Sequence, residues 1–326
     1  MTNYIEMEKL NKMRENAFIN VTRGSGREFV TVAVIVRELA AKYKKVYCAA
    51  FNYEFVEALS KEMDNVVPIK ENEIGSFWNT HWTELYGNVD VYSEEPYNLG
   101  RFGMRRLHFI DAYRFVTGLT DYKEPNSWED GYRETELPEI QVSTEIRNAA
   151  IDFSKQHKKF VIVQFHGGQN PAGMQPNQPY NYDEVGLKRH YPLDKAEELC
   201  AKLKADGYEV LHYTLPNEPH LKNCIYMQQI MPQLFYHELA KYAEGIITID
   251  SSLMHLGIAH AKKMVVIWVQ TNPISFGYYK ATNLRKVKDD DIGGPSMQGV
   301  PLNPVVEYPT VDEVYEAFTK TNKQYK

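Results

Sequence analysis

Short apolar segments that suit β-strands alternate with helical segments along most of this chain. Each apolar segment is a few residues long and rich in β-branched or aromatic side chains, without the regular polar alternation of a half-exposed strand. Such runs are typical of strands that helices cover on both faces, as in a parallel sheet. The sequence therefore predicts an α/β fold with parallel sheets, whose strands we expect at residues 17–21, 46–50, 89–92, 160–165, 209–213, 245–249 and 264–269.

The intervening segments have the spacing of amphipathic helices. In residues 193–203 the apolar side chains recur every three or four positions, and Gly207 follows where a helix would end. Residues 29–40 are apolar nearly all round, but their length and charged tail favour a helix over a strand. We expect further helices at 107–116, 144–156 and 311–320.

A break in this alternation divides the chain. Residues 120–145 are rich in turn formers and acidic residues, and the strand–helix pattern starts afresh at Phe160. The length of 326 residues also suits two domains. We expect two Rossmann-like α/β domains, residues 1–145 and 146–326, that face each other across a cleft.

Composition and charge exclude several classes of protein. The net charge of −6, from 37 Lys and Arg against 43 Asp and Glu, excludes a chain that is basic throughout and binds nucleic acid by bulk electrostatics. No apolar run approaches the ~18 residues that a membrane span needs. The N-terminus lacks the apolar core of a signal peptide, and the three cysteines lie far apart in the sequence, which argues against a disulfide framework. These features predict a cytoplasmic protein.

Motifs for common cofactors are missing from the sequence. It contains neither a complete GxGxxG fingerprint nor GxxxxGK[ST], so NAD and P-loop ATP sites are not expected. The ten histidines include no HExxH pair, and we expect no metal site.

The most informative stretch is residues 245–279. It reads as a strand that ends at Asp250-Ser251-Ser252, a helix that begins near Leu253, and a second strand. Backbone N–H groups and hydroxyls at a strand-to-helix turn can bind an anion, and ligands of open α/β sheets bind at this edge. Plain capping of the helix by Asp or Ser explains the same residues without a ligand.

Residues 250–261, Asp-Ser-Ser-Leu-Met-His-Leu-Gly-Ile-Ala-His-Ala, resemble the donor-site signature of glycosyltransferase family 9, roughly D-[ST]-G-x-x-H-L-A-A-A. This family includes the ADP-heptose:lipopolysaccharide heptosyltransferases. A second block, Lys188-Arg189-His190-Tyr191-Pro192, is similar to the family's K-x-W-P block. The strand before it ends in His166-Gly167-Gly168, where the family has a turn of small residues.

The resemblance implies a glycosyltransferase B-type fold and a metal-independent, inverting transfer of a sugar from a nucleotide-diphosphate sugar to an acceptor hydroxyl. The N-terminal domain would bind the acceptor, a glycan or lipopolysaccharide by family default, and the C-terminal domain would bind the donor. No further cofactor is implied. Lys188 would offset charge on the departing diphosphate, and the donor-binding residues would be His166, Gly167, Gly168, Lys188, Asp250, Ser251, Ser252 and His255.

The N-terminal turn departs from the family. It reads Gly24-Ser25-Gly26-Arg27-Glu28 where the family has Gly-Asp, whose aspartate is thought to take the proton of the acceptor hydroxyl. An inverting transfer needs a base within hydrogen-bond reach of that hydroxyl. Glu28 and Asp111 are our candidates for this catalytic role, and Asp90 and Glu94 are further acids in the same domain.

Two other functions stay open on the sequence. A basic cluster of Arg101, Arg105, Arg106, His108 and Arg114 suits a phosphorylated acceptor, or DNA with a hydroxymethylated base as in phage base glycosyltransferases. The missing Gly-Asp suits a non-catalytic module that only holds a nucleotide or a partner. The central expectation is that Lys188 and the turn after residue 249 meet at one diphosphate.

Overall fold

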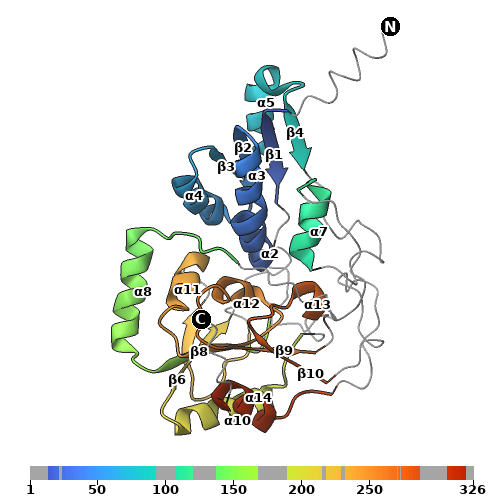
Figure 1. Ribbon diagram of the computed structural model, residues 1–326. Coiled ribbons are helices and arrows are strands. Elements are labelled where there is room, and N and C mark those ends of the chain that lie inside the picture. The colour runs from blue at the N-terminus through green and yellow to red at the C-terminus, as the bar shows by residue number, and fades with distance from the viewer. Residues whose placement is uncertain are drawn as a thin grey trace.

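The computed structural model describes residues 14–21, 24–92, 108–119, 137–167, 189–214, 218–228, 232–269, 271, 273–286 and 307–320. Figure 1 shows two lobes, one above the other, each built around its own sheet. All strand pairs in both sheets are parallel. The prediction of an α/β fold with parallel sheets is confirmed.

The first sheet has four strands in the order β3-β2-β1-β4. Its strands are β1 (Asn16–Asn20), β2 (Lys45–Ala50), β3 (Val66–Lys70) and β4 (Val89–Tyr92). Its helices are α2 (Ser25–Val30), η1 (Thr31–Val36), α3 (Arg37–Lys42), α4 (Tyr53–Glu62), η2 (Glu71–Glu73), α5 (Ile74–Leu85) and α7 (Phe109–Val116).

The second sheet has six strands in the order β10-β9-β8-β5-β6-β7. Its strands are β5 (Phe160–Gln164), β6 (Glu209–Thr214), β7 (Ile225–Gln228), β8 (Gly245–Ile249), β9 (Met264–Trp268) and β10 (Thr282–Arg285). Its helices are α8 (Thr144–Gln156), α10 (Leu193–Ala205), α11 (Gln233–Leu239), α12 (Ser252–Gly257), α13 (Pro273–Phe276) and α14 (Val311–Lys320).

The seven predicted strands are all present, and three strands were missed. Those three, β3, β7 and β10, each lie at an edge of a sheet. An edge strand has one neighbour and is less buried, so its sequence is less apolar; β3 even contains Pro68, which an edge strand tolerates. The ambiguous segment 29–40 is helical, as predicted, within a continuous run of α2, η1 and α3.

The two lobes share one hydrophobic core. Phe29 of α2 and Phe55 of α4 belong to the same buried cluster as Leu253 and Leu256 of α12. The amino end of α2 points at the second lobe in Figure 1, and α2 packs directly against α12. The carboxyl ends of the central strands of both sheets therefore lie close to this junction, where the turn after Ile249 is also found.

Candidate functional site

The turn between β8 and α12 is held by buried hydroxyls. Ser251 is buried, and its Oγ donates to Gln164 Oε1 of β5 at 2.6 Å and lies 2.9 Å from Thr248 Oγ1. This bonding fixes the turn against the end of the neighbouring strand. Because the Ser251 proton is used within the protein, this hydroxyl could only accept a hydrogen bond from a ligand.

Asp250 lies beside a cation from the second predicted block. Arg189 Nε is 3.4 Å from Asp250 Oδ2, and the Asp250 side chain is only 5% exposed. The structure therefore brings the block around residue 189 to the turn after β8. Lys188 and Gly168, two of the predicted donor-site residues, lie outside the described residues.

The position of Arg189 carries a signal that our sequence reasoning missed. In the K-x-W-P pattern the lysine precedes the proline by three residues, and the residue three before Pro192 is Arg189. Tyr191 then stands at the tryptophan position, fully buried, with its Oη donating to the Pro309 carbonyl at 2.9 Å. Counting back from the proline would have selected Arg189 as the cation.

His166 and Gly167 complete this grouping at the end of β5. Gly167 has a φ of 156°, and a Cβ placed on it would lie 3.0 Å from Gln164 Nε2 and 3.9 Å from Ser251 Cβ. The Gly167 carbonyl also lies 3.2 Å from His190 Nε2. Burial lowers the pKa of His166 to about 3, with smaller contributions from two other histidines, so its imidazole is neutral at neutral pH.

His255 lies at the contact between the lobes. Its Nδ1 is 2.6 Å from Tyr278 Oη, and its ring packs edge-on against Phe109 of α7. Burial lowers its pKa to about 3, and nearby His108, Arg189 and Arg27 lower it further. His255 is therefore a neutral, enclosed imidazole with positive charge around it, contributed by both lobes.

The glycine turn of the first lobe meets α12 directly. A Cβ placed on Gly26 would lie 2.5 Å from His255 Cδ2 and 3.1 Å from Ser252 Cα. Only a residue without a side chain permits this approach. The residue after Gly26 is Arg27, a cation at the position where the family pattern has an aspartate.

Both candidate bases are already bonded within the protein. Glu28 is fully buried, and its carboxylate accepts from the backbone N–H groups of Phe51, at 2.9 Å, and Asn52, at 3.4 Å, and from the Asn52 side-chain amide. Burial raises the pKa of Glu28, although these hydrogen bonds oppose the rise. The structure thus places Glu28 at the carboxyl end of β2, where its hydrogen bonds stabilise the turn that leads into α4.

Asp111 belongs to an ion-pair network on α7. Its Oδ1 lies 3.1 Å from Arg114 Nη1, and Arg114 also binds the Glu38 carboxylate of α3. Of the predicted basic cluster, Arg101, Arg105 and Arg106 lie outside the described residues, whereas His108 is buried and Arg114 is paired with Glu38 and Asp111.

The first lobe also caps a helix of the second. The Glu54 carboxylate of α4 accepts from the backbone N–H of Gln233 at 2.9 Å and of Leu234 at 3.5 Å, at the start of α11. Burial raises the pKa of Glu54, and the same two hydrogen bonds lower it.

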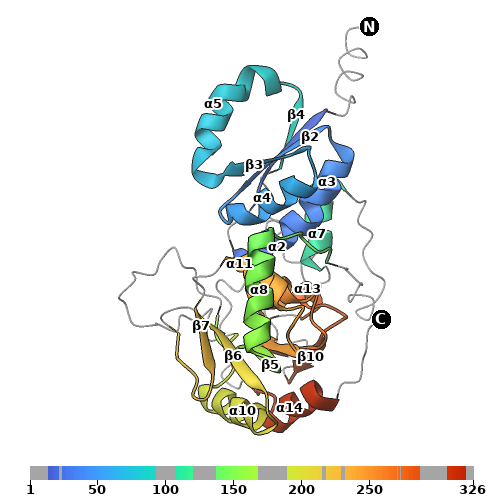
Figure 2. The ribbon, with the colours of Figure 1, turned by 90° about the vertical axis from the view of Figure 1, so that its left-hand side faces the viewer.

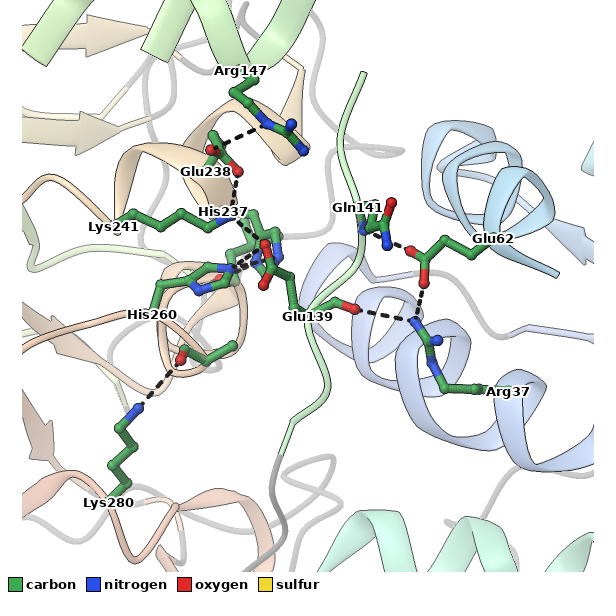
Figure 3. Close-up of polar contacts among 12 residues, drawn as sticks. Arg37, Glu62, Glu139, Gln141, Arg147, His237, Glu238, Lys241, His260 and Lys280 are labelled. Carbon is green, nitrogen blue, oxygen red and sulfur yellow. Dashed lines mark hydrogen bonds and ion pairs between the residues drawn. The ribbon is translucent and has the colours of Figure 1, made fainter. Parts of the chain in front are cut away.

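The segment that contains Glu139 and Gln141 connects the two lobes, and polar contacts hold it to both of them, as Figure 3 shows. On the first-lobe side, the Glu139 carbonyl accepts from Arg37 Nη2 at 3.1 Å, and the Gln141 N–H donates to Glu62 Oε1 at 2.6 Å. On the second-lobe side, the Glu139 carboxylate accepts from Lys241 Nζ and lies 3.9 Å from His260 Nε2.

This cluster extends to the helix that carries His255. His260 Nε2 and His237 Nε2 lie 3.1 Å apart, and His237 Nδ1 lies 2.7 Å from the Leu256 carbonyl near the end of α12. Because a carbonyl only accepts, His237 carries its proton on Nδ1, and the proton between the two rings belongs to His260. A connected set of contacts therefore runs from the interlobe segment to α12.

Within the described part of the chain, no group of three His, Cys, Asp or Glu side chains is placed to hold a metal ion. In the same residues, no helix has both the length and the apolar character required to cross a bilayer.

Solved structures of glycosyltransferases share this fold. A glycosyl transferase family 9 protein from Veillonella parvula matches with a TM-score of 0.60 at 13% identity, over 93% of this chain and 96% of that one. ADP-heptose lps heptosyltransferase II from E. coli matches with a TM-score of 0.59 at 16% identity, over 94% of this chain and 98% of that one. The iron-containing dodecameric glycosyltransferase TibC from enterotoxigenic E. coli gives a TM-score of 0.53 at 13% identity, over 85% of this chain and 64% of its own.

No protein-family model matches the sequence, and no curated protein sequence is significantly similar to it. At these identities the structural likeness establishes the fold. The two-lobed fold that the family resemblance implied is therefore confirmed.

Proposed function

We propose that this protein is a glycosyltransferase that moves a sugar from a nucleotide-diphosphate sugar to an acceptor hydroxyl, by an inverting and metal-independent reaction. The observation that carries the proposal is the meeting of three separate chain segments, around Gly167, Arg189 and Asp250, at one edge of the second sheet. This edge is where open α/β sheets bind ligands. The TibC structure with bound ADP-D-β-D-heptose supports a nucleotide-diphosphate donor for this fold.

In this proposal the second lobe, residues 146–326, binds the donor. Arg189, together with Lys188 before it, faces the diphosphate and offsets the negative charge that develops as the nucleotide leaves. Asp250 holds the Arg189 guanidinium in place, because the two groups are 3.4 Å apart and Asp250 is almost fully buried. His166, Gly167, Gly168, Ser251, Ser252 and His255 shape the remainder of the donor site.

The first lobe, residues 1–145, binds the acceptor, and we assign the base to Glu28 rather than Asp111. Glu28 lies at the carboxyl end of β2, on a helix that packs against α12, whereas Asp111 is paired with Arg114. A pKa raised by burial suits a carboxylate that must take a proton near neutral pH. For this role the hydrogen bond from the Asn52 side-chain amide to the Glu28 carboxylate has to break, so that the acceptor hydroxyl can donate to the carboxylate instead.

A non-catalytic nucleotide-binding module is the second candidate function. The observation that favours it is that both proposed bases are bonded within the protein and that a cation, Arg27, follows Gly26. Such a module would bind the nucleotide without catalysing sugar transfer.

Nucleotide binding and turnover test these functions separately. Thermal unfolding with ADP, UDP, GDP and their sugar conjugates should reveal a stabilising nucleotide, because a ligand that binds only the folded state raises the unfolding temperature. Arg189→Ala should weaken that nucleotide by about 10- to 100-fold, since a charge-assisted bond to phosphate contributes about 1.5–3 kcal/mol. The control is Lys222→Ala, which removes a 77% exposed cation of the same lobe.

The two candidates differ in turnover. The transferase releases nucleoside diphosphate from its sugar conjugate slowly in water and faster with acceptor, and Glu28→Gln abolishes release while leaving binding intact. Binding without release by the wild type indicates the non-catalytic module. No stabilisation of folded protein by any nucleotide in the panel contradicts both.

A further inference from the structure

Among the residues that the structure describes, a single helix, α5, packs on one face of the first sheet. Alternation along the strands sends Ala17, Ile19 and Cys48 to the face that packs with α2, η1 and α3, and sends Phe18 and Tyr47 to the other face, under α5. Figure 2 shows α5 on one side of this sheet and α3 on the other. A cavity of about 440 Å³ lies between α5 and strands β2 and β3.

Aromatic rings form one wall of this cavity. The rings of Tyr47 and Phe77 have centroids 5.0 Å apart, and those of Phe77 and His81 are 4.9 Å apart. Val67, Pro68 and Ile69 of β3 add apolar surface. Burial and the nearby Glu84 carboxylate raise the pKa of the Tyr47 hydroxyl, which therefore stays protonated and can donate a hydrogen bond.

Polar groups surround these rings. Glu73 and Glu84 bring two carboxylates to the lining, and Lys45 brings one ammonium group. Ser76 and Thr80 also line the cavity, and their hydroxyls donate to helix carbonyls at 2.8 and 2.9 Å, so their oxygens remain able to accept. Glu73 Oε1 lies 3.9 Å from Lys70 Nζ, and Glu84 Oε2 lies 3.5 Å from His81 Nδ1. The lining therefore has no surplus of positive charge that would attract an anionic ligand such as a phosphate.

We propose that this cavity binds a sugar ring of an uncharged glycan. Sugar rings present an apolar C–H face that packs on aromatic rings, and hydroxyls at their edge that donate to carboxylates, which matches both kinds of lining group. The cavity volume of about 440 Å³ lies in the range of small-molecule sites, and its lining is divided about evenly between apolar and polar residues.

This sugar site is separate from the donor site. All of its lining residues lie between Lys45 and Glu84 of the first lobe, whereas the proposed donor site is formed by the second-lobe segments around Gly167, Arg189 and Asp250. The inference that the cavity binds an uncharged sugar rests on the residues that line it. That the bound sugar belongs to the acceptor glycan rests on the proposed function.

A blocking variant and its neighbour test the site. Thr80→Trp places a large ring in the cavity from an exposed helix position, and Thr83→Trp places the same ring on the same helix at an exposed position outside the lining. On an array of neutral and anionic glycans, we expect the wild type to bind at least one neutral glycan. Titration calorimetry with that glycan should show at least tenfold weaker binding for Thr80→Trp and unchanged binding for Thr83→Trp.

Three results overturn the proposal. These are no neutral glycan bound, binding confined to anionic glycans, or equal binding by the two variants. Nucleotide stabilisation is measured in parallel and should be the same for Thr80→Trp and wild type. Glycan binding that survives without any nucleotide effect keeps the sugar site and removes the proposed transferase, so the two claims fail separately.

Discussion

Gly26 of the first lobe and His255 of the second are packed so closely that a methyl group on Gly26 would lie 2.5 Å from the imidazole. The ring cannot easily retreat, because Tyr278 and Phe109 lie against it. The two segments that the sequence singled out, the glycine turn and the donor-site motif, thus touch across the lobe boundary.

Gly26→Ala should therefore lower the free energy of unfolding by about 1–3 kcal/mol, the usual cost of forcing an extra methyl into a packed core. It should also weaken nucleotide binding, because the added methyl displaces His255 or α12. Urea unfolding and nucleotide titration measure the two effects. Gly75→Ala is the matched control, since no atom lies within 4 Å of its added methyl; equal effects of the two variants would contradict the close contact.

Glu54→Ala should destabilise the junction of the lobes by about 1–2 kcal/mol, because it leaves the first N–H groups of α11 without their carboxylate cap. Glu57→Ala on the same helix is the comparison, as it removes a half-exposed carboxylate that pairs with Lys61. Chemical denaturation of both variants gives the difference, and no greater loss for Glu54→Ala would argue against capping across the lobes.

The ion pair of Glu139 and Lys241 should show measurable coupling. Burial raises the pKa of Glu139, but the hydrogen bond from Lys241 and the nearby His260 outweigh this and leave it lowered. In a double-mutant cycle of Glu139→Gln and Lys241→Met, we expect a coupling free energy of about 0.5–1 kcal/mol, because both groups are partly exposed. The pair of Glu244 and Lys262, whose lysine is more exposed than Lys241, should show a smaller coupling free energy. Equal coupling in the two pairs would contradict a stronger contact between Glu139 and Lys241.

Buried histidines should make the protein sensitive to acid. Burial lowers the pKa to about 3 for His166 and His255 and to about 4 for His108 and His212. In the unfolded chain these residues return to an ordinary pKa near 6.5. Between pH 6.5 and about 4, these histidines are protonated in the unfolded state but remain neutral in the folded state. Stability is therefore fully present above pH 6.5 and falls as the pH drops, by at most about 1.4 kcal/mol per pH unit for each histidine.

His212 isolates this effect. Both of its ring nitrogens are buried and have no hydrogen-bond partner among the residues that the structure describes. His212→Leu should remove one titrating group without breaking a bond, and so reduce the dependence of unfolding free energy on pH. Unfolding free energies that stay level between pH 7 and pH 5 would contradict the account.

The sequence allowed the central strands to be predicted, because burial on both faces leaves a continuous apolar run. Strands such as β10, with the sequence Thr-Asn-Leu-Arg, carry no such signal, since an edge strand is specified by its one neighbour. Amphipathic spacing allowed helices such as α8, α10 and α14 to be predicted, but α4 and α5 were missed. The site was partly predictable in the same way. Motif spacing identified Asp250 and His255. The proximity of Asp250 to Arg189 follows from the parallel pairing of β8 with β5, the strand that precedes the Arg189 segment.

Side-chain roles were the least predictable part. Ser251 reads as a ligand-binding hydroxyl in the motif, yet its proton goes to Gln164, a residue 87 positions away in the chain. In the sequence Glu28 is a candidate base just beyond a glycine turn, yet the structure buries it among the hydrogen-bond donors of the β2–α4 turn. Such partners come from the packing of distant segments, and spacing along the chain does not encode them.

A crystal structure with the stabilising nucleoside diphosphate tests the central claim most directly. The account predicts that the diphosphate lies within hydrogen-bond distance of the Arg189 guanidinium, beside the turn of Asp250 and Ser251 and facing Gly26 of the first lobe. A diphosphate bound elsewhere on the molecule, with Arg189 still paired only to Asp250, would contradict it.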